Sequence, residues 1–157
     1  MTIPGIGRRT AEVLLAEIGR DMGRFPSAAH LASWAGMCPG NHQSAGRRKS
    51  GRTRKGSPWL RAALIEAAQA ARRSKGTYLG AQYARLAARR GAKKAAVAVG
   101  HSILISAYHL LKRRDTYDDL GDAYFDRRDR ERAERRLVHR LEALGFRVTL
   151  DAAGPAA

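Results

Sequence analysis

The chain carries at residues 39–61 the stretch PGNHQSAGRRKSGRTRKGSPWLR, which is rich in cations and contains no carboxylate. Glycine, serine and proline separate the cations, so we expect a basic loop between helices, placed at residues 37–57. A candidate nucleophile, Ser44, lies just before the first arginines. A hydroxyl among many cations, with no acid nearby, points to a phosphate backbone as the ligand.

The positive charge of the chain, formally +16 over 157 residues, is concentrated in one region. Residues 22–114 hold nineteen lysines and arginines and one carboxylate, Glu66, whereas residues 115–157 are nearly balanced. Such a field attracts polyanions, because each neutralised phosphate releases condensed counterions. We therefore expect nucleic acid as the partner. The alternative is a composition that only keeps the protein soluble.

Length and composition fit one globular core. A chain of 157 residues with 44% apolar residues can bury roughly two thirds of its unfolded surface. Cys38 is the single cysteine, and the first residues lack a secretory-signal pattern, so we expect a cytoplasmic protein without an internal disulfide. The longest apolar run, residues 95–111, contains Gly100 and two histidines and is shorter than a membrane span of ~20 residues. A buried helix and no membrane association are expected.

Apolar periodicity and capping residues predict a mainly α domain in which strands are scarce. Ser27 is placed to cap a short helix, and Ser57 followed by Pro58 is typical of a helix start. Gly76 and Gly91 fall where helix ends are expected. We assign residues 1–114 to this basic domain, with helices predicted at residues 27–34, 57–73, 77–90 and 92–114.

The first residues are expected to form part of a helix-hairpin-helix motif, over residues 1–20. IPGIG at residues 3–7 places two glycines before a helix with an apolar face. Gly5 and Gly7 would allow a phosphate backbone to approach the turn closely, and the start of the helix would favour phosphate binding. The first helix of the motif is absent from the sequence, so we expect a part of something longer. A plain glycine turn before a helix remains the alternative.

The last part of the chain is expected to differ from the basic domain. Residues 115–150 are predicted to hold a polar connection, a long charged helix at 122–144 and a short strand at 147–150. Asp126 with Arg130, and Glu131 with Arg135, have the i,i+4 spacing of helical ion pairs. The helix carries a leucine stripe that favours packing or oligomer formation, and residues 151–157 are expected to be disordered. The leucines are Leu137, Leu141 and Leu144.

A series of short motifs resembles a known family. The order is IPGIG, then GMCP at residues 36–39, QS at 43–44, a basic stretch, RKG at 54–56 and WLR at 59–61. It is similar to the C-terminal transposase domain of the insertion-sequence-110 family, which includes the Piv and MooV invertases. The resemblance implies a DNA recombinase that also uses a RuvC-like domain with four metal-binding carboxylates. It further implies Mg²⁺ held mainly by that domain and not by this chain, action as a homo-oligomer and, in some members, a guide (bridge) RNA.

The resemblance assigns the covalent nucleophile to Ser44, five residues after Pro39. The family has its serine ahead of a glycine, whereas this chain reads Ser-Ala-Gly, and Ser50-Gly51 supplies the literal dipeptide. The spacing favours Ser44 over Ser50. Arginines can clamp phosphates with paired donors, and lysines add point charge. The candidate nucleic-acid-binding residues are Gly5, Gly7, Arg47, Arg48, Lys49, Arg52, Arg54, Lys55 and Arg61.

Other functions compete with a transposase domain. A serine hydrolase is disfavoured because residue 42 is His, not the Gly of a nucleophile elbow. Cys38 and His42 lack the second ligand pair of a zinc site. The serious rival is a non-catalytic nucleic-acid-binding module, or the remnant of a truncated transposase. Four aromatic residues have a helical spacing that favours core packing over base stacking: Trp34, Trp59, Tyr78 and Tyr83.

Overall fold

The computed structural model describes residues 2–40 and 42–151, without the side chains of residues 42, 43, 48 and 49. Of the predicted disordered tail, all but Asp151 lies outside the described residues. The chain forms two compact units, Met1–Asp122 and Ala123–Ala157. The first unit ends at Asp122, beyond the domain boundary predicted at residue 114.

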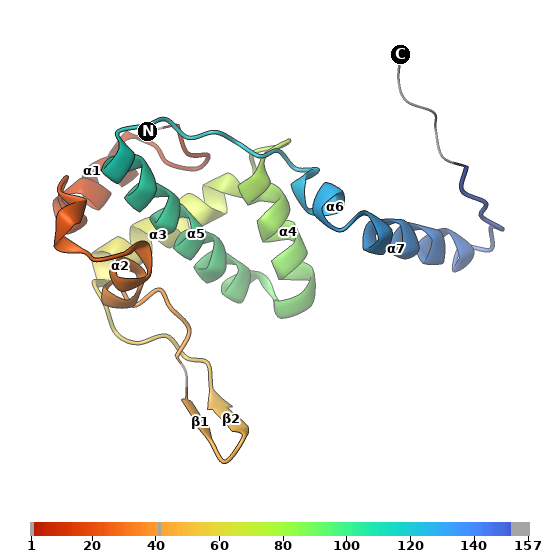
Figure 1. The fold of residues 1–157 in the computed structure, drawn as a ribbon, viewed down its shortest axis with the longest axis horizontal. Helices are drawn as coiled ribbons and strands as arrows, with labels where there is room; N and C mark the ends of the chain where they lie inside the picture. Colours follow the sequence, from red (N-terminus) through yellow and green to blue (C-terminus); the bar gives the residue numbers. More distant parts are fainter. Residues whose placement is uncertain (1, 41, 152–157) are drawn as a thin grey trace. The chain divides into compact units, whose positions relative to one another are not determined.

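The first unit is a helical body with one small hairpin (Figure 1). The predicted mainly α fold is confirmed, while the segment predicted as an irregular loop contains two antiparallel strands. The elements in chain order are α1 Arg8–Ile18, the 3-10 turn η1 Met22–Arg24, α2 Ala28–Trp34, β1 His42–Ser44, β2 Arg47–Ser50, α3 Pro58–Ala71, α4 Tyr78–Arg90 and α5 Ala92–Arg113.

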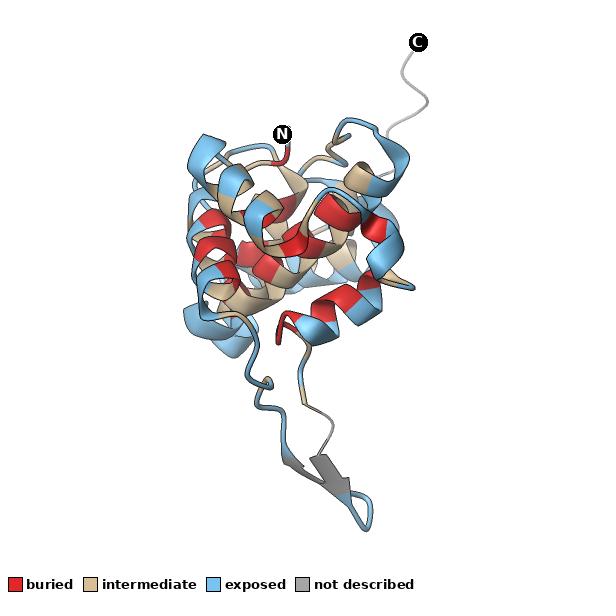
Figure 2. Cartoon of the chain, turned by 90° about the vertical axis from the view of Figure 1, so that its left-hand side faces the viewer, coloured by how far each residue is buried: buried red, intermediate tan, exposed pale blue. Residues whose placement is uncertain are grey.

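The core of this unit is built around α5, which contacts α2, α3 and α4. Its buried side chains include Val99, Ile103 and Leu104, and Figure 2 shows the buried residues facing inward among the helices. Gly100 lets α5 approach α3 closely, because a Cβ there would lie 3.1 Å from the Leu64 carbonyl oxygen. By length and composition α5 could cross a membrane. Its buried face instead makes it the central core helix that was predicted.

Helix boundaries follow the capping residues in the sequence. Ser57 Oγ accepts a hydrogen bond from Leu60 N at 3.2 Å, which confirms the predicted start of α3. Thr77 Oγ1 accepts from Gly80 N at 3.2 Å at the start of α4. Gly91 has a φ of +83° and both ends α4 and begins α5. The Ser57 and Thr77 side chains thus satisfy N–H groups that a helix start leaves without intrahelical partners.

The N-terminal glycine turn packs against the second half of α3. Gly5 has a φ of +87°, and a Cβ on it would lie 2.2 Å from the Ala67 carbonyl oxygen. Gly7 caps α1 with extended backbone and has no heavy atom within 4 Å of a Cβ position. Gly5 is thus explained by contact with α3, whereas Gly7 lies open. A helix-hairpin-helix function for this turn stays a prediction.

Residues 115–122 form a strap that returns to the body. Tyr117 N donates to Thr2 Oγ1 at 2.8 Å. Tyr78 N, in the first turn of α4, donates to Asp119 Oδ1 at 2.8 Å. Burial, with the Asp119 charge as the next cause, raises the pKa of Tyr117 to about 12, so its hydroxyl stays protonated at neutral pH. The strap therefore belongs to the first unit.

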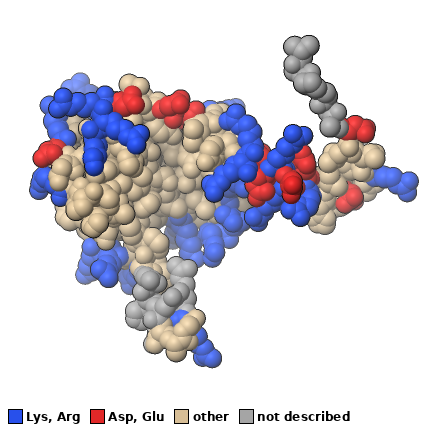
Figure 3. Space-filling view, in the orientation of Figure 1, with Lys and Arg blue, Asp and Glu red and all other residues tan. Residues whose placement is uncertain are grey.

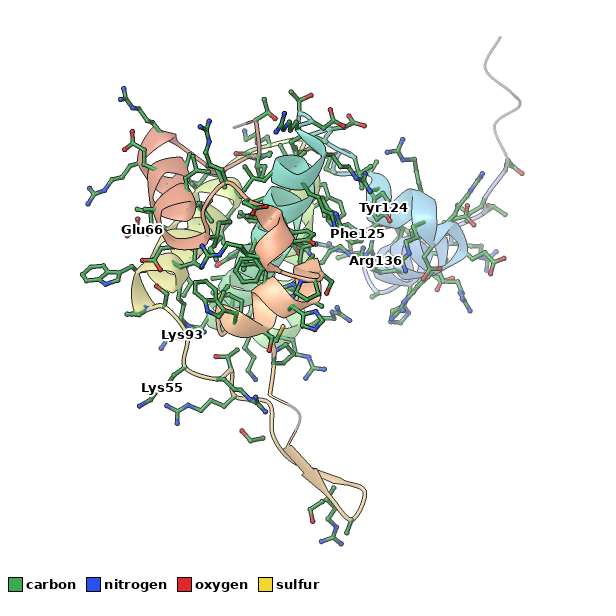
Figure 4. The ribbon with its side chains drawn as sticks, turned by 60° about the vertical axis from the view of Figure 1, so that its left-hand side comes forward. Lys55, Glu66, Lys93, Tyr124, Phe125 and Arg136 are labelled. Atoms are coloured by element: carbon green, nitrogen blue, oxygen red, sulfur yellow. The ribbon has the colours of Figure 1, made fainter. Side chains whose placement is uncertain are left out.

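The second unit contains two helices, α6 Tyr124–Arg128 and α7 Arg130–Glu142. The predicted continuous helix at 122–144 is interrupted at Asp129, whose φ and ψ of −137° and 65° are not helical. Arg130 pairs with Glu134 at 2.6 Å, and Arg136 links α7 to Asp126 of α6 at 3.1 Å. Figure 4 labels Arg136 and the α6 aromatics Tyr124 and Phe125.

The predicted strand at residues 147–150 is wrong, because that segment has no regular secondary structure. A strand needs a neighbour to satisfy its backbone groups, and the described part of this unit provides none. The leucine stripe of α7 is exposed, with Leu137 at 55% and Leu144, just beyond the helix, at 68%. Its use in oligomer formation stays a prediction.

We expect Gly5→Ala to lower the free energy of unfolding by about 2–4 kcal/mol, because the methyl group must displace α3 and a positive φ strains alanine. Gly7→Ala is the matched control and should cost less than about 1 kcal/mol. Urea denaturation followed by circular dichroism measures both. Equal losses in the two variants would contradict the packing of this turn on α3.

Candidate nucleic-acid interface

The hairpin β1–β2 projects from the helical body (Figures 1 and 2), and Ser44 is the residue just before its turn. It is the last residue of β1 and pairs with Arg47, the first residue of β2. The two-residue turn between them has positive φ at both Ala45, 49°, and Gly46, 73°, as in a type I′ hairpin turn. Ser44 and Arg47 are both exposed. The fold thus presents the serine beside a cation at the outermost point of the basic loop.

The turn gives no reason for the departure from a simple Ser-Gly sequence, because residue 45, where that sequence has glycine, itself has a positive φ. Gly46 adopts the left-handed conformation without strain, while Ala45 in that region costs about 1 kcal/mol. Ser50, the other candidate nucleophile, is already engaged, because its Oγ accepts a hydrogen bond from Arg52 N at 3.1 Å. The Ser44 hydroxyl has no hydrogen bond to any described residue. This difference agrees with the preference for Ser44 that the spacing from Pro39 gave.

Glycines bring the two arms of the loop together below the hairpin. Gly40 N donates to the Arg52 carbonyl at 3.1 Å, and a Cβ on Gly40 would lie 2.4 Å from that oxygen. Gly36 has a φ of +67°, and its Cβ would lie 2.7 Å from the Arg54 carbonyl. Gly56 is equally close to the end of α2, with a Cβ position 2.3 Å from the Ala35 carbonyl. The root of the hairpin therefore has no space for side chains.

Arg61 ties this root to α3. Its Nη1 donates to the Gly36 carbonyl at 2.9 Å and to Thr53 Oγ1 at 3.0 Å, so one half-buried guanidinium holds both arms. The sequence predicted Arg61 as a nucleic-acid contact, and that role stays a prediction. The position of Arg61 adds a structural role that sequence reasoning missed.

The remaining cations of the loop face solvent. Arg47, Arg52, Arg54 and Lys55 are exposed, while the side chains of residues 48 and 49 lie outside the description. On the face shown in Figure 3, lysine and arginine flank the point where the hairpin leaves the body, and the carboxylates of this unit lie at its upper and left edges. The described part of the loop forms no ion pair. These charges are available to an external anion.

The glycine turn at residues 3–7 is not part of this cluster. Gly5 contacts Ala67 and Ala71 at the end of α3, whereas the loop enters α3 at Pro58. At 1.5 Å per residue, these ends are separated by about 20 Å. The structure therefore brings together the candidate residues of the loop and leaves Gly5 and Gly7 elsewhere.

The aromatic residues divide into two groups. Tyr83 is buried, at 2% exposure, and Tyr78 is half-buried, as core packing predicted. Core packing is wrong for Trp59, which is 74% exposed in the first turn of α3, next to the loop. Trp34 is 49% exposed and rests on Phe25 at 5.6 Å between ring centroids. The prediction from helical spacing failed for Trp59 because this residue precedes the buried stripe of α3, which starts at Leu60.

Comparison with known proteins places this domain among the transposases. The chain belongs to the family described as Transposase IS116/IS110/IS902, whose model matches residues 1–84, more than half of its length. It is 58% identical over 43 residues to the pilin gene-inverting protein of Moraxella bovis, covering 27% of this chain and 13% of that protein. The same values hold for the pilin gene-inverting protein of Moraxella lacunata.

A third relative is the uncharacterized 43.6 kDa protein of insertion element IS110 from Streptomyces coelicolor. The identity is again 58%, over 38 residues, which are 24% of this chain and 9% of that protein. The chain thus aligns with a small part of each of these relatives. The family resemblance predicted from the ordered motifs is confirmed.

We expect Arg61→Ala to loosen the root of the hairpin, because the Gly36 carbonyl and Thr53 lose a charged donor worth about 1–3 kcal/mol. Hydrogen exchange of the Gly40 amide, followed by NMR, should accelerate, and Arg61→Lys should fall between alanine and wild type. Lys55→Ala, at an exposed neighbouring cation, is the control and should leave the exchange rate unchanged. Unchanged exchange in Arg61→Ala would show that Arg61 does not hold the arms together.

Proposed function

We propose that this chain is the C-terminal, serine-bearing domain of a DNA transposase that cleaves and rejoins DNA through a covalent phosphoserine intermediate. A RuvC-like carboxylate domain completes the proposed machinery. The observation that carries the proposal is the position of Ser44, exposed at the tip of an acid-free basic hairpin in a chain of a transposase family. A serine buried in the helical core would not reach a phosphate in this way.

In the proposed reaction the Ser44 hydroxyl oxygen attacks a phosphorus atom of the DNA backbone. The new Oγ–P bond forms as the bond to the 3′ oxygen breaks, the serine proton passes to a base, and the departing oxygen takes up a proton as a free 3′-hydroxyl. The phosphoserine preserves the energy of the broken bond, so a 3′-hydroxyl can reverse the step on a new partner. Cleavage and rejoining then need no external energy source.

The cations of the hairpin would stabilise the charge that grows on the phosphate oxygens. Arg47 faces Ser44 across the turn, so its guanidinium can bind the same phosphate that Ser44 attacks. Fixed cationic donors at such a position lower the barrier, because they need little reorganisation as charge develops. Arg52, Arg54 and Lys55 follow β2 in the arm that leads to α3 and suit neighbouring phosphates.

Activation of the serine is assigned to groups beyond the hairpin. The family implies Mg²⁺, but the described residues of this chain contain no group of three or more histidine, cysteine or acidic side chains that could hold a metal. The residues described here therefore do not fit a Mg²⁺ site. In the proposal that site belongs to the RuvC-like domain.

The other proposed partners follow from the family and from the nature of the substrate. A DNA substrate inside the cell would place the protein in the cytoplasm. A homo-oligomer would supply one serine for each strand that is cut, and a guide RNA would select the site in members that use one.

The decisive test of the nucleophile is a Ser44→Ala variant. The chain is mixed with a family RuvC-like domain, Mg²⁺, candidate guide RNA and end-labelled element-junction DNA, and protein–DNA adducts are separated on a denaturing gel. We expect wild type and Ser50→Ala to form the adduct and Ser44→Ala to lose it entirely. An adduct retained in Ser44→Ala would end the assignment, and binding without any adduct would favour the non-catalytic module or remnant.

Binding through the loop is tested by Arg52→Glu with Arg54→Glu. Each lost phosphate contact should reduce the slope of log affinity against log salt by about 0.9, so the double variant should bind a DNA duplex more weakly and with a flatter slope by about 1.8. Arg132→Glu with Arg140→Glu, on the exposed surface of α7, carries the same charge change as a control. An unchanged slope in the loop variant would show that these arginines do not contact phosphates.

A further inference from the structure

Four cations surround the turn between α4 and α5. Arg89 and Arg90 end α4, Lys93 and Lys94 lie in the first turn of α5, and Gly91 with a φ of +83° joins the helices. All four side chains are exposed, and none is in an ion pair with a described residue. We call these four residues the basic turn.

Helix stability accounts for only two of the four cations of the basic turn. Cations at the end of a helix interact favourably with its dipole, which accounts for Arg89 and Arg90. Lys93 and Lys94 have the opposite placement, since cations in a first turn are unfavourable by about 0.3–1 kcal/mol each. The first turn of α5 also has no acidic residue and no side-chain cap. The two lysines are thus unfavourable for the isolated helix, and helix stability does not explain them.

The start of α5 suits an oxyanion in its own right. Gly91 provides no capping side chain, so the first N–H groups of α5 have no side-chain cap. Such groups bind phosphate oxygens, and two lysines beside them increase the attraction. A phosphate here would satisfy the N–H groups and offset the repulsion among the four cations.

The basic turn lies on the side of the body from which the hairpin projects. Figure 4 shows Lys93 of α5 and Lys55 of the loop on that side. Figure 1 shows the joined ends of α4 and α5 facing the same direction as the hairpin. Glu66, the single carboxylate between residues 22 and 114, lies on α3. One polyanion could therefore run along this side from the hairpin to the basic turn.

We propose that the basic turn binds a second stretch of DNA backbone, so that one duplex is held by the hairpin at one place and by the start of α5 at another. The inference rests on the proposed function only in taking DNA as the polyanion. It gives the domain a fixed point of contact that is separate from the projecting hairpin.

The test is Lys93→Glu with Lys94→Glu, because binding and stability should change in opposite directions. Acidic residues in the first turn of α5 should leave the melting temperature unchanged or raise it. Affinity for a duplex of about 30 base pairs should fall at least tenfold at low salt, with a salt slope flatter by about 1.8. Fluorescence anisotropy across a salt series measures affinity, and calorimetry measures melting.

The matched control is Arg113→Glu with Arg114→Glu, at the other end of α5 and about 30 Å away. It makes the same charge change at exposed residues, and its salt slope should stay close to that of wild type. Lys93→Gln with Lys94→Gln removes the charges without reversing them and should show a smaller loss of the same kind. It keeps the test valid if the acidic variant is poorly folded.

Two results would overturn the inference. Equal losses of affinity in the basic-turn variant and its control would mean that only the overall field of the protein attracts DNA. A loss confined to an RNA hairpin of similar charge would assign the basic turn to RNA instead. The outcome is independent of the Ser44 adduct: a basic turn that binds DNA without any adduct would leave this contact standing and remove the proposed chemistry.

Discussion

The close approach of two backbone segments at residues 36–40 and 52–56 is the constraint on which the site depends. Gly36, Gly40 and Gly56 leave no room for side chains between the segments, and Arg61 holds both to α3. A two-stranded hairpin on its own is marginally stable in water. The direction in which the hairpin projects is therefore set at this root. The position of Ser44 depends on these contacts, which are made far from the turn of the hairpin.

The helical part of the fold could be predicted because its signals are local. Ser57 and Thr77 cap the helices they precede, and Gly91 separates α4 from α5 as expected. The hairpin could not be predicted in the same way. Its turn, Ala45-Gly46, lacks the asparagine or aspartate that usually marks a type I′ turn, and its strands lack β-branched residues. The strand predicted at residues 147–150 is absent. Local β-propensity favoured it, but a strand also needs a neighbouring strand, which local sequence does not provide.

For the candidate site, the sequence pointed to individual residues and not to the contacts that hold them in place. The loop cations follow from residue type, and Ser44 follows from its place in the basic loop together with the family resemblance. The anchoring role of Arg61 depends on a residue twenty-five positions earlier, Gly36, and no local pattern encodes such a contact. The helix predicted from residue 92 already put Lys93 near a helix start, but its position on the hairpin side could be seen only in the structure.

The strap has a mechanical consequence. Tyr117 N and Thr2 Oγ1 hold two distant points of the chain together by one hydrogen bond, so the backbone enters and leaves the helical body at nearly the same place. Tension applied at these two points would load that single bond before the packing of α5 against α3 and α4. The strap would then detach first, while the core that supports the hairpin stays folded.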